Sequence, residues 1–498
     1  MSEYIVDTEY GKVQGYERDG IIEYLGIPYA KPPVGKLRFK RARKCDPYAG
    51  IFDAKEYGDP CIQKDMNGIR GSEDCLTVNV QRPISGGKLP VFVYIHGGGF
   101  STGAASDGLL DGRRFAEDGL VFVSFQYRLN VLGFYDFSTY PGCGEFETNC
   151  GLSDQILAMQ WIHRNIAAFG GDPENVTIDG ESAGASSVVN MLAAPAVKGC
   201  FQKAIMQSAL PNCVATSRHA RENVDLFLEG MGWTESELSE KLWTVDAKDF
   251  LEGNDYMAKH HQEKNPGNFL PALVIDDQLP QRPLDAIKNG CAKDVKIIIG
   301  TNRHEGTMFV HPGDATETGF PNSWAMVREM FEKNGNADAL GRIAQFYPGM
   351  EADAGLDDFV EFGTHYAFEM PSVKLACFQK AYTPDVWLYR YEFVSKSGEK
   401  NGMKASHAFD LPLSFANRTD GFSKFIYGED DEADFDALVH AVHDAWVSFA
   451  KEGNPGADWK PFSGDAPSVR VINRESASCP FDRQEMLDAW GDLRFYEN

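Results

Sequence analysis

The 498-residue sequence lacks several features that would assign it to whole classes of protein. It contains no run of eighteen apolar residues, so it offers no candidate for a membrane-spanning helix. Its ten cysteines are too sparse for a disulfide scaffold and lack the Cys-x-x-Cys spacing of metal sites. No internal repeat or low-complexity linker interrupts the chain. We therefore expect a soluble globular protein with no bound metal and no cofactor.

Positive charge is also scarce. The chain has 48 Lys and Arg residues against 73 Asp and Glu residues, which gives a net charge of −25. Such a surface repels nucleic acid and anionic membranes, so we expect neither as a partner. The N-terminal residues show no basic stretch followed by an apolar one, which predicts a cytoplasmic protein, although a chain trimmed of its signal peptide would look the same. The sequence does not indicate an oligomeric state.

What the sequence does have is a globular composition, 43% hydrophobic and 12% aromatic, and a Gly-x-Ser-x-Gly motif around Ser182. The β-branched residues at 176–178 predict a buried strand, and the small residues at 183–189 predict a helix. A serine at a tight strand-to-helix turn has a strained backbone, and its hydroxyl is exposed at the top of a sheet. The five-residue motif alone also fits an ordinary glycine-rich turn.

A second glycine-rich stretch follows the apolar run 91–95, which predicts a buried parallel strand. Gly97, Gly98 and Gly99 are consecutive and are followed by Phe100. Consecutive glycines allow backbone N–H groups to point into a cavity, as the stabilisation of a developing oxyanion requires. A flexible linker is the alternative, but linkers do not directly follow buried strands.

Two further residues complete a pattern of nucleophilic catalysis. Glu305 follows a strand expected at 295–299, and carboxyl ends of parallel strands are where catalytic groups gather. His407 follows a strand expected at 386–394, which gives the chain order serine, acid, histidine. The other histidine pairs are not predicted to form a metal site. The adjacent His260 and His261 are expected to be solvent-exposed, and His440 and His443 are expected to lie on a helix face.

Together these stretches resemble the type-B carboxylesterases, a family with the α/β-hydrolase fold. The resemblance runs from a predicted hairpin at 4–16 to the C-terminus. It implies one domain, 1–498, with a central, mostly parallel sheet flanked by helices and an antiparallel edge at its N-terminal end. Helical insertions are expected at about 216–290 and 311–380, where they would form the wall of the pocket.

The resemblance also implies roles for site residues. Ser182 is acylated, His407 is its base, and Glu305 is the acid that holds the histidine, with His304 standing where the family usually has aspartate. The oxyanion is expected to bind the amides of Gly98, Gly99 and Ala183. Substrate contacts are expected from Glu181, Phe100 and Ala215.

Structural pairs are implied as well. In the family the position of Cys75 closes a surface loop with an earlier cysteine, here Cys61, but a reducing compartment would leave both as thiols. Ser208 is expected near the triad acid, or as an ordinary serine at a strand end. Two buried ion pairs are expected, Arg38 with Glu73 and Arg128 with Asp154.

The substrate class is less sharply indicated. A lipase or an amidase is an alternative, because it would use the same triad. A non-catalytic adhesion module is another, but relatives of that kind have lost the serine that is present here. Cholinesterase-like relatives bind choline on a tryptophan in the loop that ends at the position of Cys75, whereas 61–75 has no aromatic residue. Ala215 stands where those relatives place an acyl-pocket tryptophan. The acyl side of the pocket is therefore expected to be roomier. We expect good turnover of neutral esters with butyryl or larger acyl groups, and acetylcholine as a poor substrate, unless aromatic residues of the insertions refill the pocket.

Overall fold

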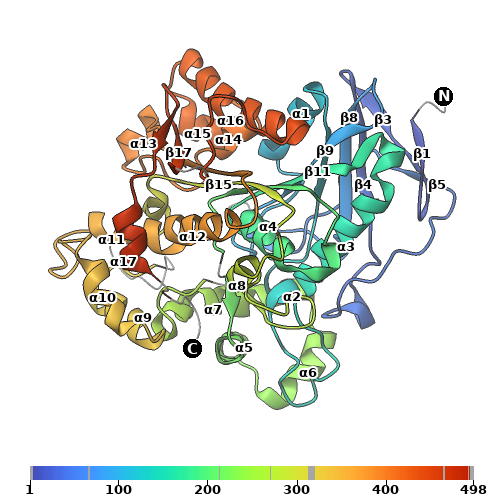
Figure 1. Ribbon diagram of the computed structural model, residues 1–498. Helices are drawn as coiled ribbons and strands as arrows, with labels where there is room; N and C mark the ends of the chain where they lie inside the picture. The colour runs from blue at the N-terminus through green and yellow to red at the C-terminus, as the bar shows by residue number, and fades with distance from the viewer. Residues whose placement is uncertain are drawn as a thin grey trace.

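The computed structural model describes residues 4–65, 68–211, 213–269, 271–311, 320–463, 466–491 and 493. Over these residues the chain forms an eleven-stranded sheet flanked by helices on both faces (Figure 1). In spatial order the strands are β18 (Ala477–Pro480), β17 (Ser468–Ile472), β16 (Val386–Tyr391), β15 (Lys296–Asn302), β12 (Lys203–Gln207), β11 (Gly171–Glu181), β9 (Leu89–Ile95), β10 (Val121–Phe125), β8 (Thr77–Pro83), β4 (Ile21–Pro28) and β3 (Tyr16–Arg18).

The strands from β17 to β10 are parallel to their neighbours. Both edges are antiparallel, with β18 at one end and β8, β4 and β3 at the other. The expected mostly parallel sheet is confirmed. The N-terminal hairpin does not belong to it, however, because β1 (Ile5–Thr8) and β2 (Gly11–Gln14) pair with β5 (Ile51–Asp53) in a separate small sheet.

Side chains of the central strands point alternately to the two faces of the sheet and so contribute to two hydrophobic cores. In β9, Val91, Val93 and Ile95 join one core, whereas Phe92 and Tyr94 join the other. Successive side chains of a strand point to opposite faces, so a strand that is apolar throughout must be covered on both sides. Helices cover the first core with α3 (Cys150–Asn165), α4 (Ala183–Ala193), α8 (Pro283–Lys288) and α12 (Met370–Gln379), and the second with α1 (Arg113–Glu117), α14 (Leu411–Ser414), α15 (Gly421–Tyr427) and α16 (Glu432–Glu452).

Helices occupy both ranges in which insertions were expected. The first range holds α5 (Ser217–Met231), α6 (Glu235–Thr244) and α7 (Phe250–Lys264), with α2 (Asn130–Phe134) against α7. The second holds α9 (Trp324–Lys333), α10 (Ala337–Ala344) and α11 (Asp357–Thr364), which form a third core with α17 (Gln484–Trp490) (Figure 1). A π-helical turn, His365–Glu369, connects α11 to α12. Although α8 and α12 fall within the expected ranges, they contribute to the core on the sheet face.

The two expected ion pairs are present. The guanidinium of Arg38 lies 2.6 Å from the carboxylate of Glu73 in a partly buried contact, and that of Arg128 lies 2.7 Å from Asp154 in a fully buried one. Cys61 and Cys75 are free, buried thiols, and the Leu129 amide donates a hydrogen bond to Cys61 Sγ at 3.2 Å. In the described part of the chain, no helix is both long and apolar enough to cross a membrane.

Candidate active site

Ser182 occupies a single-residue turn between β11 and α4. Its backbone has φ 57° and ψ −120°, a region that non-glycine residues rarely adopt. The amide of Ser182 donates to the carbonyl of Gln207 at 2.9 Å, which ties the turn to the neighbouring strand β12. The side chain is partly exposed and lines a cavity. The strained serine expected from the sequence is therefore present, with its side chain partly exposed.

The glycines of the motif are required by close packing. A Cβ atom on Gly180 would lie 2.4 Å from the carbonyl carbon of Gly184. A Cβ atom on Gly184 would lie 2.0 Å from the carbonyl oxygen of Ile95. Both distances are far shorter than any real carbon contact, so the strand and the helix can pass only because neither residue has a side chain.

Glu305 lies just beyond β15 and is fully buried. Its Oε1 accepts hydrogen bonds from the Ser208 hydroxyl and the Asn302 amide, both at 2.6 Å. Its Oε2 lies 2.6 Å from Nδ1 of His407. Ser208 thus contacts the expected triad acid directly. The amide of His304 donates to the carbonyl of Ala405 at 3.0 Å, so this loop is also held to the loop that carries His407.

His407 is buried with its two ring nitrogens in different surroundings. Nδ1 faces Glu305, whereas Nε2 lies 3.2 Å from Oε1 of Glu181 and has no hydrogen-bond partner among the described residues. The rings of Phe309 and Phe368 pack on the imidazole, with centroids 5.1 and 4.9 Å from its own. The carboxylate on Nδ1 fixes the ring so that Nε2 is the nitrogen left for proton transfer.

Asp410 holds the loop of His407 to the central sheet, a role that was not predicted from the sequence. Its buried carboxylate accepts hydrogen bonds from Gln207 at 3.1 Å, Asn302 at 3.1 Å and Tyr389 at 2.9 Å. These donors come from β12, β15 and β16. Asp410 therefore joins the histidine loop to three neighbouring strands.

The charges around His407 act on its protonation. Burial alone would lower the pKa of His407, but the carboxylates of Glu181 and Glu305 outweigh burial and raise it to about 9. Burial also raises the pKa of Glu181, to about 8, because the charged carboxylate loses its solvation. A proton shared by His407 and Glu181 is therefore bound more tightly than a proton on an ordinary histidine.

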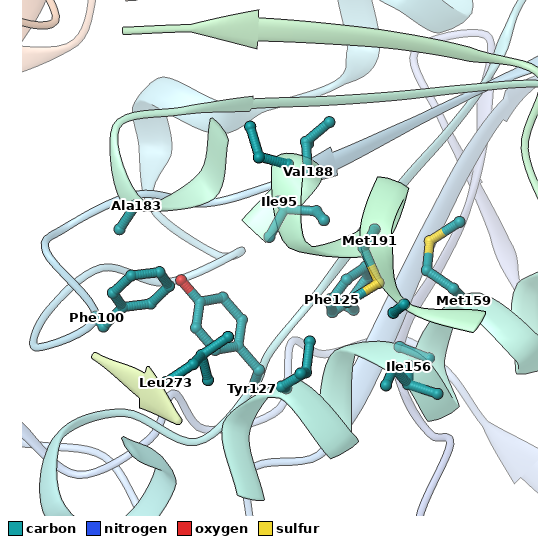
Figure 2. Packing of buried hydrophobic residues seen from close by; sticks show 14 of the residues in the cluster. Ile95, Phe100, Phe125, Tyr127, Ile156, Met159, Ala183, Val188, Met191 and Leu273 are labelled. Carbon is teal, nitrogen blue, oxygen red and sulfur yellow. The ribbon is translucent and has the colours of Figure 1, made fainter. Parts of the chain in front are cut away.

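The loop after β9 has an unusual backbone. Gly98, Gly99 and Phe100 have φ angles of 100°, 61° and 56°. The amides of Gly98 and Gly99 donate no hydrogen bond to any residue that the structure describes, and Ala183, as the first residue of α4, has no helical acceptor for its own amide. These three amides are free to bind an anionic oxygen. Phe100 and Ala183 lie close together at the edge of the core (Figure 2).

A cavity of about 210 Å³ lies above Ser182. Gly99, Phe100 and Ala183 line it on one side, and no charged side chain is among its described lining residues. The opposite wall comes mainly from the two insertions and is largely aromatic. This wall includes Phe269, Phe309, Phe320 and Phe368 together with His261, Gln262 and Asn268.

Comparison with known proteins decides the family. The family model described as the carboxylesterase family matches residues 2–490. The chain belongs to the carboxylesterase family. It is 36% identical over 487 residues to the para-nitrobenzyl esterase of Bacillus subtilis, covering 95% of this chain and 96% of that one. It is 31% identical over 504 residues to the phenmedipham hydrolase of Pseudarthrobacter oxydans, covering 96% and 97%.

Solved structures agree. A structure titled PNB esterase aligns with this carboxylesterase at a TM-score of 0.86 and 35% identity, covering 98% of this chain and 99% of that chain. A second, titled thermophylic PNB esterase, gives a TM-score of 0.87 at 34% identity, covering 98% and 99%. The fold is that of the α/β-hydrolases, and the chain is a serine carboxylesterase that acts on small ester substrates.

Three expected substrate contacts of the carboxylesterase differ in their placement. Phe100 lines the cavity above Ser182. Glu181 is buried beside His407 and is not among the described lining residues. Ala215 lies in β13 (Val214–Ala215) and lines a smaller, adjoining cavity instead. The expected widening of the pocket at Ala215 therefore has no direct basis in the Ser182 cavity.

The prediction that His261 is solvent-exposed is wrong, because the structure buries it in the cavity wall. A signal was present in the sequence. Phe250, Asn254, Met257 and His261 recur every three or four residues and form the buried face of α7. Its neighbour His260 points elsewhere and lies 3.3 Å from Glu263. The spacing along the helix, and not the adjacency of two histidines, is the sequence signal that indicates the burial of His261.

Proposed function

We propose that this carboxylesterase hydrolyses small, neutral esters through an acyl-enzyme formed on Ser182. The observation that carries the proposal is the buried contact of 2.6 Å between Glu305 and Nδ1 of His407, together with Ser182 at a strained turn in a cavity whose walls include Phe309 and Phe368. Those two rings also pack on His407. Nucleophile, base and acid thus come from separate segments. Ser182 lines the cavity, and His407 contacts its wall through Phe309 and Phe368.

In this proposal His407 moves the protons. Its Nε2 takes the hydroxyl proton of Ser182 as Oγ attacks the ester carbonyl carbon, and it then gives that proton to the departing alcohol. Glu305 keeps the other proton on Nδ1 and stabilises the imidazolium. Water then attacks the acyl-enzyme with the same base, which releases the carboxylic acid and restores Ser182.

The amides of Gly98, Gly99 and Ala183 bind the oxyanion in this scheme. Each such donor is worth about 2.7–4 kcal/mol in the transition state when it is fixed before the reaction. The positive φ angles of Gly98 and Gly99 support this role, since they leave both amides outside any hydrogen-bonded ladder.

The shape and chemistry of the cavity support neutral substrates. An apolar space of about 210 Å³ without charged lining suits an uncharged acyl or alcohol group of modest size. A lipase or an amidase on the same triad is less favoured, because the named relatives include esterases and the cavity is small.

Labelling with a fluorophosphonate followed by mass spectrometry tests the proposal. We expect one adduct, on Ser182, and loss of p-nitrophenyl ester hydrolysis by several orders of magnitude in Ser182→Ala with the folded state intact. An adduct on any other residue, or a Ser182→Ala enzyme with full activity, contradicts the assignment.

A further inference from the structure

Four buried polar side chains gather beside the cavity of Ser182. The exposed fractions of His219, Asn223, His261 and Asn268 are 4%, 7%, 2% and 6%. All four line a small cavity of about 10 Å³. A space of this size holds a single water-sized group.

The small cavity and the Ser182 cavity share a wall. His261 and Asn268, with Cys213 and Phe269, line both. A substrate bound at Ser182 therefore lies next to the polar cluster.

His261 offers an unused hydrogen-bond donor. The side-chain nitrogen of Gln262 donates to the carbonyl of Asn268 at 2.8 Å and lies 3.3 Å from Nδ1 of His261. Because an amide nitrogen donates, Nδ1 of His261 accepts, and the proton of the neutral ring is on Nε2. Nε2 has no partner among the residues that the structure describes.

Asn268 and Asn223 offer unused acceptors. The side-chain nitrogen of Asn268 lies 3.3 and 3.4 Å from the ring nitrogens of His219, which leaves its oxygen for another partner. Neither Oδ1 of Asn268 nor Oδ1 of Asn223 is hydrogen-bonded within the described part of the chain. A buried polar atom left without a partner is destabilising, so a ligand that accepts from Nε2 of His261 and donates to one of the two asparagine oxygens is favoured.

The cluster carries no charge near neutral pH. Burial lowers the pKa of His261 to about 3 and, with the nearby charge of Arg218, lowers that of His219 to about 4. Both rings are therefore neutral, and they match a group that is itself uncharged and both donates and accepts.

We propose that this cluster is a subsite for a neutral hydroxyl group on the substrate chain. The hydroxyl oxygen accepts from Nε2 of His261, and its hydrogen is donated to Oδ1 of Asn268 or Asn223. The proposal rests on the proposed function, because it needs an ester bound at Ser182. It makes the enzyme selective for esters whose chain carries a hydroxyl at one fixed distance from the ester carbon, and a carboxylate or a larger amide exceeds the volume.

Two series of p-nitrophenyl and alkyl esters test the subsite. In one series the hydroxyl moves along the acyl chain, and in the other along the alcohol portion, each compared with the plain ester of equal length. We expect one position in one series to raise kcat/KM by about tenfold or more over the plain ester, since a site that lacks a hydrogen-bond partner discriminates against analogues without the hydroxyl.

Variants assign the preference to the cluster. His261→Leu removes the donor and is expected to abolish the preference, whereas His261→Gln retains an N–H and part of the preference. His260→Leu makes the same change on the same helix outside both cavities, and the preference should survive there. Asn223→Leu, on α5, is a second test should His261→Leu fail to fold.

Absence of any hydroxyl preference in the wild-type enzyme would overturn the proposal and leave the site as a place for one bound water. A preference that persists in both His261→Leu and Asn223→Leu would also overturn it. These results differ from failure of the proposed function, in which plain esters are not hydrolysed and Ser182 is not labelled.

Discussion

At the scale of single residues, the position of Glu181 sets the electrostatics of the site. It precedes the nucleophile in sequence, yet its carboxylate lies 3.2 Å from Nε2 of His407. Two carboxylates then face one imidazole, Glu181 on Nε2 and Glu305 on Nδ1. Together they favour the protonated ring more than a lone triad acid does.

The pH dependence of activity follows from this arrangement. His407 must be neutral to accept the serine proton, and Glu181 and Glu305, against burial, raise its pKa to about 9. We expect kcat/KM to fall on the acid side with a midpoint above pH 6.5, which is the pKa of an unperturbed histidine. In Glu181→Gln one carboxylate is lost, the pKa of His407 falls, and this acid limb moves to lower pH.

The pH profile of the purified enzyme, measured with an uncharged ester, checks this shift. Glu17→Gln, on the exposed strand β3, is the matched control and should leave the limb in place. A limb near pH 6.5 in the wild-type enzyme, or one that does not move in Glu181→Gln, would contradict the assignment of Glu181.

At the scale of elements, the turn of Ser182 depends on contact between backbones. Gly184, in the first turn of α4, lies against the end of β9, where a methyl group would lie 2.0 Å from the Ile95 carbonyl oxygen. The helix and the strand cannot separate without moving Ser182, because Ser182 is joined directly to α4.

We expect Gly184→Ala to lower the free energy of unfolding by about 1–3 kcal/mol, as overpacking does, and to impair ester hydrolysis by displacing Ser182. Gly341→Ala is the control, since its Cβ meets nothing within 4 Å in helix α10. Chemical denaturation and kcat/KM together check this. Equal stability and activity in the two variants would show that the close approach is not required.

The aromatic wall comes from turns and from the π-helical turn beside the insertion helices, and it bears on choline esters. Phe309, Phe320 and Phe368 are stacked on one another, with centroids 4.9–6.3 Å apart and interplanar angles of 14–24°. Rings that pack against one another in this way shield part of their faces from a quaternary ammonium. The insertions do refill the pocket with aromatic side chains, but not as an open cage.

We therefore expect acetylcholine to be favoured over its uncharged carbon isostere by less than about tenfold in kcat/KM, or roughly 1.4 kcal/mol. The comparison of these two substrates is direct because they have the same shape. A larger preference for acetylcholine would show that one of the phenylalanine faces binds the cation.

At the scale of the whole molecule, a buried ion pair joins the segment after β10 to the helix α3, which packs on the sheet. Arg128 follows β10 and Asp154 lies on α3, and both are buried in a contact of 2.7 Å. Removal of one partner leaves the other charge buried without compensation.

Asp154→Asn is accordingly expected to lower the free energy of unfolding by about 3–5 kcal/mol. Asp7→Asn, which removes an exposed partner of Lys12, should change it by no more than about 1 kcal/mol. Denaturant unfolding of both variants checks the contrast, and similar losses would mean that the buried pair adds no more than a surface one.

The sequence predicted those features of the fold and the site that depend on residues close together in the chain. Ser182 at a tight turn, the glycine loop at 97–99 and the central strands each depend on a few neighbouring residues, and the structure has them where they were expected. The ion pairs Arg38 with Glu73 and Arg128 with Asp154 were implied by resemblance and are confirmed.

The rest depends on contacts between distant segments. Phe269 and Phe368 are a hundred residues apart and meet only when two insertions fold over the sheet. His261 was missed because its burial is set by the face of α7, and the placement of Ala215 depends on β14 (Leu273–Val274), with which its strand pairs. The shifted pKa of His407 likewise requires the spatial position of Glu181.

The π-helical turn His365–Glu369 connects the insertion to α12 and carries Phe368 against His407. A π turn contains one more residue than the α-helical turn that it replaces, and one residue corresponds to about 100° of rotation around a helix. Deletion of the residue between Phe368 and α12 is therefore expected to turn the ring away from the imidazole if α12 keeps its place on the sheet. The width of the substrate cavity can thus be altered by the length of the chain at this point, with every catalytic side chain unchanged.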